Sequence, residues 1–390
     1  MREGWEYKKL GEVCESIDSI NWRAVSEQET FTYIDLSAVD RESRSIVGTI
    51  KITKEDAPSR AKQIVQTDDI LFGTTRPTLK RVCQIIKEYN ETICSTGFCV
   101  LRPKTNIVIP KWILLQLLAN NFYLYIEPLQ TGANYPAVSD NIVKKYVIPV
   151  PPLSVQQSIV SELDLLSEVI AKQKDELKAY DELAQSIFYD MFGDPVTNEK
   201  GWEVKKLGEV CLIERGGSPR PIEQFLTEDD DGVNWIKIGD ATEGGMVITS
   251  TKQRIRPEGV KKSRFVHKGD FLLSNSMSFG KPYILGVDGC IHDGWLVIQD
   301  TQHTFNKIYL YYFLGSPQTY ESFKSMAVGG VVNNLNKDIV KKVYVAIPHA
   351  KIQQSFAEKI ASIERQKDLI RQSIAETETL FNSRMDYYFN

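Results

Sequence analysis

The sequence predicts two globular α/β (α+β) units, each followed by one long coiled-coil helix. Two observations lead to this fold class. An offset of 197 residues maps the segment that begins at Gly4 onto the segment that begins at Gly201, so the chain contains two copies of one unit. At the end of each copy, apolar residues recur at alternating steps of four and three, which is typical of a coiled-coil helix.

The two copies share a frame but not an interior. The run Gly-Trp-Glu-x-Lys-Lys-Leu-Gly-Glu-Val-Cys begins at Gly4 and returns at Gly201, and Ile-Val-Lys-Lys at residues 142–145 recurs at the same offset. Between these matching ends, residues 20–130 and 217–327 differ almost beyond alignment. We therefore expect one structural frame that carries two inserts, each binding a different target.

Each interior is predicted to be a mixed α/β domain. Short runs of β-branched and aromatic residues alternate with Gly, Pro and Asp, as strands and turns do. Strands are predicted at 31–36, 70–73, 82–86 and 98–101 in the first copy and at 235–238, 270–273 and 294–298 in the second, with helical stretches at 111–127 and 305–326.

The first long helix has clear end signals. Pro151-Pro152 cannot lie inside a helix, and Ser154 followed by Gln157 forms a capping-box pattern, so the helix is predicted to begin at about residue 155. Gly193 and Pro195 are predicted to end it. Its length of about 38 residues corresponds to roughly 57 Å. Such a helix has no core of its own, and the repeat supplies its partner helix at the end of the second copy.

The second long helix is less regular than the first. It lacks the double proline and the serine cap, so its start is less firmly placed. Lys367 and Arg384 also interrupt its apolar seam.

Composition favours a globular protein with reduced thiols. The 390 residues are 42% apolar and 25% charged, which suits two or three domains with their own cores. The six cysteines include no Cys-x-x-Cys pair, so we expect buried thiols rather than a zinc site or disulfides. The start lacks the apolar core of a signal peptide, and no run approaches about 18 apolar residues, so we expect no membrane contact and a cytoplasmic location.

Positive charge is concentrated in the two inserts. The whole chain carries a formal charge of −4, which argues against tight independent binding to DNA. Residues 51–104, however, hold ten Lys or Arg against six acids, and residues 252–281 hold eight against two. The first long helix, residues 153–192, has eight acids and three bases. This pattern suits a polyanion held at two places, although a solvated surface would also be charged.

One polar loop in each insert carries side chains that can form hydrogen bonds with the edges of DNA bases. Residues 73–81 and 274–281 each follow a predicted strand, and Arg and Asn can bond guanine and adenine bidentately. The alternative is a polar turn that satisfies its own backbone. For residues 215–220 the alternatives are a phosphate-binding nest and a flexible turn. For residues 132–135 and 329–334 they are a close approach to the nucleic acid and a simple reversal of the chain. The candidate DNA-binding residues are Arg60, Lys62, Thr74, Thr75, Arg76, Lys80, Arg81, Arg220, Lys252, Arg254, Lys261, Lys262, Arg264, Asn275, Ser276, Ser278 and Lys281.

The chain resembles the specificity subunits of type I restriction-modification enzymes. The resemblance rests on the repeated opening run, on the run Ile-Pro-Val-Pro-Pro-Leu-Ser-Val-Gln-Gln at residues 148–157, and on two inserts that each precede a long helix. It covers the whole chain. The second copy departs from it at residues 346–354, where the double proline is missing.

The resemblance implies a two-part reader of double-stranded DNA. Residues 1–150 and 193–347 would be target recognition domains, one for each half of a split asymmetric site, and residues 151–192 and 348–390 would be spacer helices. The helices would pack antiparallel, giving an internal pseudo-twofold repeat. Rods of this length would separate the domains by roughly one to one and a half turns of B-DNA, at about 34 Å per turn.

The resemblance also implies partner proteins that carry the chemistry. These would be two modification (methyltransferase) subunits, which use S-adenosylmethionine to methylate adenine, and restriction/translocase subunits, which use ATP and Mg. We expect no cofactor, no metal and no catalytic residues on this chain. It contains neither an Asn-Pro-Pro-Phe or Asn-Pro-Pro-Tyr motif nor a phosphate-binding loop.

Two alternative functions remain open at this point. Asp194-Pro195 ahead of Glu203-Val204-Lys205 suggests a nuclease, although the same Glu-x-Lys stands at residues 6–8 of the first copy without a matching acid. The other alternative is a coiled-coil scaffold whose inserts bind proteins. A scaffold would not show the steep salt dependence of phosphate contacts.

Overall fold

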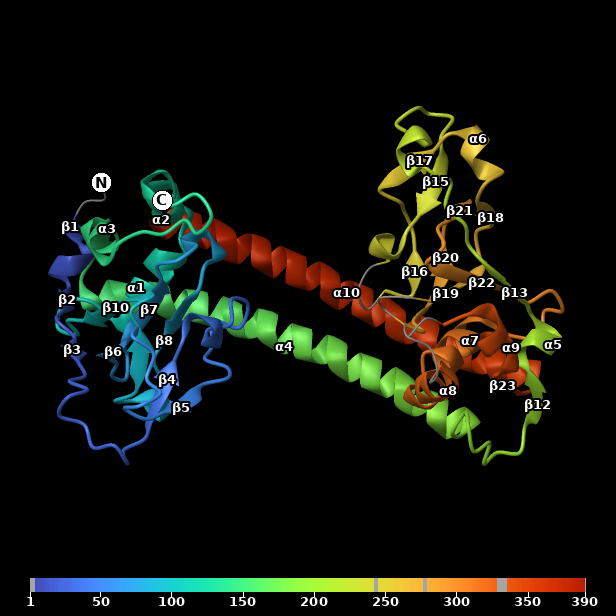
Figure 1. Ribbon diagram of the computed structural model, residues 1–390, viewed down its shortest axis with the longest axis horizontal. Helices are drawn as coiled ribbons and strands as arrows, with labels where there is room; N and C mark the ends of the chain where they lie inside the picture. Colours follow the sequence, from blue (N-terminus) through green and yellow to red (C-terminus); the bar gives the residue numbers. More distant parts are fainter. Residues whose placement is uncertain (1–3, 242–244, 276–278, 328–334, 390) are drawn as a thin grey trace. The chain divides into compact units, whose positions relative to one another are not determined.

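The computed structural model describes residues 4–241, 245–275, 279–327 and 335–389. The chain forms two compact units, of which the first comprises Met1–Lys174 with Gln372–Asn390 and the second comprises Asp175–Arg371. Each unit therefore combines one globular part with half of each long helix. Most elements recur in the same order in the two copies, and the second copy adds β16 (Val247–Ile248) and the short helix α6 (Pro257–Val260), both labelled in Figure 1.

A short two-stranded ribbon and a helix form the repeated frame. In the first unit they are β1 (Glu6–Lys9) paired with β11 (Val147–Val150) and the helix α3 (Asp140–Lys145). In the second unit they are β12 (Glu203–Lys206) paired with β23 (Tyr344–Ile347) and the helix α9 (Lys337–Lys342). The bounds of all three elements follow the constant offset of the sequence repeat, which confirms the repeat read from the sequence.

The first unit contains two sheets beside a pair of helices. The four-stranded sheet is β2 (Cys14–Glu15), β10 (Phe98–Pro103), β7 (Ile70–Gly73) and β8 (Val82–Gln84). The five-stranded sheet is β3 (Asp18–Ser19), β6 (Ala61–Ile64), β9 (Ile93–Ser95), β4 (Phe31–Ile34) and β5 (Ile50–Ile52). The predicted helix at 111–127 is two helices, α1 (Pro110–Leu118) and α2 (Asn120–Ile126), because Ala119 is extended.

The second unit contains two five-stranded sheets. The first is β13 (Leu212–Arg215), β22 (Trp295–Gln299), β19 (Phe271–Ser274), β20 (Pro282–Leu285) and β16 (Val247–Ile248). The second is β14 (Leu226–Thr227), β17 (Gln253–Ile255), β15 (Val233–Ile236), β21 (Gly289–Ile291) and β18 (Arg264–Val266). Helices α7 (Lys307–Leu314) and α8 (Pro317–Ala327) replace the single predicted stretch at 305–326.

Strand register shows that the dissimilar interiors share a central strand arrangement, β6-β9-β4-β5 in one and β18-β21-β15-β17 in the other, while the edge strands β3 and β14 lie at opposite ends. In the first unit β4 runs parallel to β9, with Tyr33 opposite Ile93. In the second unit β15 runs parallel to β21, with Trp235 opposite Cys290. Tyr33 and Trp235 are both buried, at 3% and 2% exposure. A tyrosine and a tryptophan therefore occupy the same place in the two cores.

The long helices are α4 (Leu153–Phe192) and α10 (Ala350–Phe389), each of 40 residues and related by the same offset. The predicted end of α4 is confirmed, and Gly193 adopts a φ of +77° there. The predicted start of α4 is too late, because the helix already begins at Leu153. Ser154 lies inside the first turn, so the expected capping box does not form the helix start.

The two helices pack antiparallel within each unit. In the first unit Glu162 accepts a hydrogen bond from Tyr388 at 2.6 Å, and Gln173 donates to Ser373 at 2.7 Å. As residue numbers rise on α4 they fall on α10. In the second unit Phe188 packs against Phe356, with ring centroids 5.8 Å apart.

The two basic residues that interrupt the second seam are both paired with acids. Lys367 is 4% exposed, and its ammonium lies 2.6 Å from Asp181 on α4 and 2.7 Å from Glu364. Arg384 lies 2.7 Å from Glu162. Both basic residues are therefore neutralised where they interrupt the seam, each within its own unit.

The described residues contain no helix long and apolar enough to cross a membrane. All six cysteines are buried free thiols, which confirms that part of the sequence prediction.

Candidate nucleic-acid interface

The two polar loops predicted to read base edges occupy equivalent places. In the first unit the loop begins at Thr74, whose N–H donates to the Gly97 carbonyl at 2.8 Å and whose carbonyl accepts from Val138 at 3.0 Å. In the second unit the N–H of Asn275 donates to the carbonyl of Gly294 at 2.9 Å, and the N–H of Leu335 donates to the carbonyl of Asn275 at 3.0 Å. Each loop is thus fixed at its first residue to a glycine turn and to the segment before α3 or α9.

These two first residues, both predicted as DNA contacts, anchor their loops. Thr74 is 7% exposed, and its hydroxyl donates to the Gly97 carbonyl at 2.8 Å. Asn275 is 4% exposed, and its amide donates to the Asp293 carbonyl at 2.8 Å. The hydroxyl of Thr74 and the amide nitrogen of Asn275 are therefore each engaged inside the protein.

The exposed part of the first loop lies against residues 131–137. Thr75 and Thr131 each form an antiparallel bridge with Ala137, and the Arg76 N–H donates to the Pro136 carbonyl at 2.6 Å. Residues 132–135 are a separate candidate in the sequence, and the structure brings them to the same surface as Arg76.

Further basic residues of the first unit surround the same glycine turn. The Arg60 carbonyl accepts from Thr96, next to Gly97, at 2.9 Å, and Arg60 and Lys62 both have exposed side chains. Lys80 is exposed, with its ammonium 4.5 Å from the Tyr123 ring centroid. Arg81 differs, because its Nε is buried without a hydrogen-bond partner among the described residues, so it belongs to the loop's support.

A carboxylate organises the equivalent surface of the second unit. Asp293 accepts from the Ser218 hydroxyl at 2.8 Å and lies 3.5 Å from the guanidinium of Arg220, while its carbonyl accepts from Arg215 at 2.9 Å. Burial opposes ionisation of this carboxyl, but the hydrogen bond from Ser218 and nearby positive charge together lower its pKa. The loop at 215–220 is therefore held in place, and the Arg220 side chain remains 81% exposed.

The remaining candidate residues of the second unit differ in whether their side chains are free to contact DNA. Lys252, Arg254, Lys261, Lys262 and Lys281 have exposed side chains.

The Arg264 side chain is partly used inside the protein, because it donates to the Arg215 carbonyl at 2.8 Å and to Glu214 at 3.2 Å. Ser276 and Ser278 lie outside the described residues, as do the flagged residues 329–334.

Sequence reasoning missed several side chains beside Arg220. An open hollow of about 790 Å³ adjoins Arg220, with apolar Trp235 and polar Lys237, Gln253 and His292 in its lining. These residues come from strands and turns far apart in the sequence. The one local sequence signal for this surface is the pair His292-Asp293, which directly precedes Gly294.

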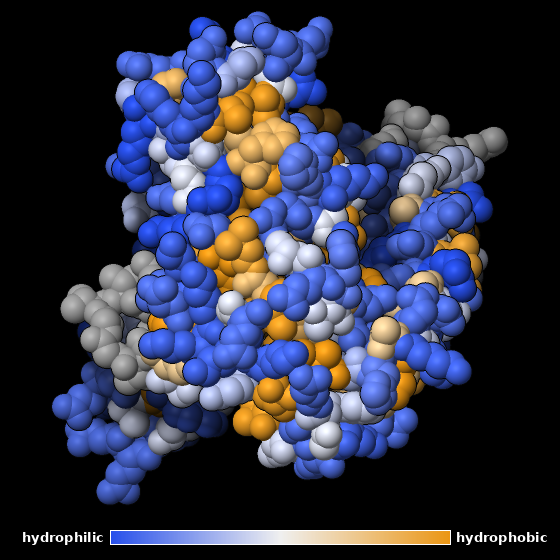
Figure 2. All heavy atoms as spheres, turned by 90° about the vertical axis from the view of Figure 1, so that its right-hand side faces the viewer, coloured by the Kyte–Doolittle hydropathy of each residue, from blue (hydrophilic) through white to orange (hydrophobic). Residues whose placement is uncertain are grey.

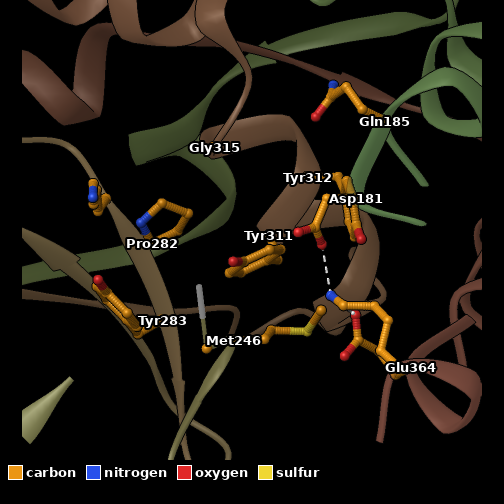
Figure 3. A pocket seen from close by; sticks show the side chains of 12 residues that line it. Asp181, Gln185, Met246, Pro282, Tyr283, Tyr311, Tyr312, Gly315 and Glu364 are labelled. Carbon is orange, nitrogen blue, oxygen red and sulfur yellow. Dashed lines mark hydrogen bonds and ion pairs between the residues drawn. The ribbon is translucent and has the colours of Figure 1, made fainter. Parts of the chain in front are cut away.

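A second cavity, of about 320 Å³, lies beside the helix pair within the second unit. Figure 3 shows Asp181 and Glu364 together on one side of it, with Tyr311 and Tyr312 nearby. Both acids bond the buried Lys367 ammonium, and burial raises the pKa of Tyr311 to about 12. The three charged groups from the long helices are therefore paired with one another, while Lys281 lines the same cavity from the globular part.

The residues that suggested a nuclease have local roles in the structure. The Asp194 carboxylate accepts from the N–H groups of Val196 and Thr197, at 2.7 and 3.0 Å, within a turn. Lys205 pairs with Glu203 at 2.9 Å, as Lys8 pairs with Glu6 in the first unit. In the ranges that the structure covers, no group of three or more His, Cys, Asp or Glu could hold a metal ion.

Comparisons with known proteins agree on one family. The family model described as type I restriction modification DNA specificity domain matches residues 2–179 and 199–379, once in each copy. The chain is 20% identical to the type I restriction enzyme HindI specificity subunit of Haemophilus influenzae, over 79% of this chain and 83% of that protein. It is also 20% identical to the MjaVIII specificity subunit of Methanocaldococcus jannaschii, over 96% and 90%.

A solved structure has the same fold. A chain from work on complex assembly and conformational transition of the type I R-M system aligns with a TM-score of 0.68 and 24% identity, covering 99% of this chain and 97% of that one.

Proposed function

Because this chain belongs to the family of type I restriction modification DNA specificity domains, we propose that it is the sequence-specific DNA-binding subunit of such a system. Each globular part would read one half of a bipartite asymmetric site, and partner subunits would methylate adenine and cleave DNA. The chain itself would be non-catalytic. The observation that supports this most strongly is that the family model matches both copies separately.

The repeated loop supports one reading surface in each unit. The anchors Thr74 and Asn275 begin equivalent loops, while the sequences that follow them differ. A common scaffold with different exposed side chains is what two different half-sites would require. In the first unit we assign base reading to Arg76 and phosphate contacts to Arg60, Lys62 and Lys80.

In the second unit Arg220 is the candidate base reader. Its exposed guanidinium is backed by the Asp293 carboxylate, which leaves the outer donors of the fork facing solvent. The exposed lysines and arginine at 252, 254, 261 and 262 would contact phosphates, whose neutralisation is independent of sequence.

The paired helices would set the gap between the half-sites. Each helix contributes to both units, and 40 residues correspond to about 60 Å of helix. A rigid helix pair fixes distance more precisely than a loop would, because its hydrogen bonds and seam contacts must all be kept.

We also propose two modification subunits that carry S-adenosylmethionine, together with restriction subunits that use ATP and Mg. Two equal docking places are supported by exposed apolar residues at matching positions of the two ribbons, namely Tyr7 and Val147 in one and Val204 and Tyr344 in the other. Figure 2 shows apolar patches among hydrophilic side chains on one face of the second unit. Partners would also contribute positive charge that a chain of net charge −4 lacks.

Methylation mapping would test the proposal. The chain is assembled with a modification subunit and S-adenosylmethionine, incubated with unmethylated genomic DNA, and methylated adenines are mapped at base resolution. We expect one motif of two short halves separated by a gap of fixed length. Binding should also weaken steeply with salt, by a log-log slope of about −0.9 per phosphate contact. Methylation without a two-part motif, or binding insensitive to salt, would contradict the proposal and favour a protein-binding scaffold.

A further inference from the structure

Two loops of the first unit hold one arginine against one exposed tyrosine. The Cζ of Arg76 lies 4.8 Å from the ring centroid of Tyr135, and Nη2 lies 3.5 Å from the Asn134 carbonyl oxygen. Tyr135 is 68% exposed, although it is a large aromatic residue. Stacking on a ring orients a guanidinium while its N–H edge stays available for other acceptors.

The backbone around this pair is fixed. The N–H of Arg76 donates to the Pro136 carbonyl at 2.6 Å, and Thr131 and Ala137 exchange two hydrogen bonds of 2.9 Å. Arg76 itself has a φ of +49°, a left-handed conformation that is unfavourable for a residue with a Cβ atom. The surrounding hydrogen bonds hold it there, so the direction of its side chain is set before any ligand arrives.

We infer that Arg76 reads a guanine in the half-site of the first unit and that Tyr135 is the positioning residue that orients its guanidinium. The inference rests on the proposed function. Guanine is the base that offers two acceptors, O6 and N7, to a planar fork of donors in the major groove. The flat guanidinium is restrained on one face by the Tyr135 ring and at one nitrogen by the Asn134 carbonyl, so it would meet that edge with little loss of rotamer freedom.

Three substitutions separate this role from a general contribution of charge. Arg76→Lys keeps the charge and removes the fork, so we expect one guanine position of one half-site to become degenerate, with discrimination reduced about tenfold or more. Tyr135→Ala should relax the same position, because it removes the orienting ring. Tyr135→Phe keeps the ring and should restore the wild-type motif. The readout is the mapped motif of the assembled enzyme.

Two control variants belong to the same experiment. Arg220→Ala, in the second unit, should change only the other half of the motif. Arg23→Ala removes an exposed arginine of the first unit from a stretch that holds none of the candidate contacts, and should leave the motif unaltered. Circular dichroism would check that each variant is folded, which is expected since Tyr135 and Arg76 are exposed.

The outcomes distinguish this inference from the proposed function. If the wild-type enzyme methylates a two-part motif and neither Arg76→Lys nor Tyr135→Ala changes it, the inference is wrong and the proposed function stands. If the relaxed position is an A·T pair, the assignment to guanine is overturned. If Tyr135→Phe behaves like Tyr135→Ala, the hydroxyl rather than the ring matters, and the stacking role is overturned. A wild-type chain that directs no two-part motif would overturn both.

Discussion

Two buried glutamines connect the long helices to the globular parts in the same way. Gln156 donates to the carbonyls of Pro151 and Ile107, at 2.8 and 3.0 Å, and accepts from the N–H of Ile109 at 3.0 Å. Gln353 donates to the Pro348 and Thr304 carbonyls at 2.8 and 3.2 Å, and accepts from Asn306 at 2.7 Å. The partners of the two glutamines are related by the offset of the sequence repeat, which explains why the first glutamine of each Gln-Gln pair recurs.

Replacing the buried glutamine should therefore destabilise one unit. Gln156 is 0% exposed, so Gln156→Ala leaves one N–H and two carbonyls without their partner, at a cost of about 2 to 4 kcal/mol. Gln157→Ala is the matched control, because Gln157 is exposed and should cost less than about 0.5 kcal/mol. Thermal unfolding with hydrogen exchange would measure this, with faster exchange expected near residue 109 and not near residue 306. Equal effects of both substitutions would argue against the anchor.

The roles of some individual residues at the site could not be predicted from the sequence. Thr74 and Asn275 have side chains suited to base contact, and nothing next to them in the sequence shows that their groups bond Gly97 and Asp293. Arg76 and Arg220 could be recognised as candidates because an arginine side chain offers a fork of donors that matches guanine. Tyr135 could only be flagged, since its contact with Arg76 joins two loops that are far apart in the sequence.

At the scale of elements, a buried lysine stands where the first unit has an apolar residue. The offset of the repeat places Lys367 at the position of Ile170 in the first copy. The lysine is 4% exposed, whereas the side chains of its partners Asp181 and Glu364 are 63% and 31% exposed. The ammonium thus loses most of its hydration while both acids can still be solvated. The attraction between the ions and the cost of burying the lysine are expected to nearly cancel.

Lys367→Ile tests that balance by installing the residue of the equivalent position. We expect the free energy of unfolding to stay within about 1 kcal/mol or to rise by up to about 2 kcal/mol, because an apolar side chain suits the seam and the two acids keep access to water. Urea denaturation of the full chain would measure it, with Arg365→Ala, at an exposed position of the same helix, as the surface control. A clear fall in the free energy of unfolding, larger than that of the control, would show that the cluster stabilises the helix pair.

Helices were easier to predict than the sheets for a physical reason. The end of α4 is encoded locally by Gly193, and its length by a seam that repeats over many turns. Pairing of β4 with β9 joins strands that are distant in the sequence and leaves no local pattern. The offset between copies is 197 at Gly97 and Gly294, yet 202 at Tyr33 and Trp235, because loops differ in length. The strand arrangement that the two interiors share is therefore visible in the strand pairing and not in the sequence.

At the scale of the whole molecule, duplication predicts both the two reading units and the helix pair that joins them. The unit boundaries cut through α4 and α10, so neither unit keeps its full packing without residues from the end of the other copy. Phe389 of α10, for example, packs against Trp112 with centroids 4.9 Å apart. A chain cut at residue 193 would therefore lose part of the first unit's core.

The helix pair makes a quantitative prediction for the gap between half-sites. Three heptads inserted into both helices at facing positions, after Gln173 in α4 and before Ser373 in α10, keep the seam in phase because heptads preserve it. They lengthen each helix by about 31 Å, which corresponds to about nine base pairs at roughly 3.4 Å each. That is close to one turn of DNA, so both half-sites would still face the protein.

Mapping methylated adenines would show whether the gap lengthens by about nine base pairs while both half-sites keep their sequences. The control carries the same insertion in α4 alone, so that the ion pair between Asp181 and Lys367 and the hydrogen bond between Tyr388 and Glu162, each at 2.6 Å, cannot both be kept, and it should abolish the two-part motif. If the double insertion leaves the gap unchanged, the helices do not measure the distance. If it changes the half-sites themselves, base reading is not confined to the globular parts.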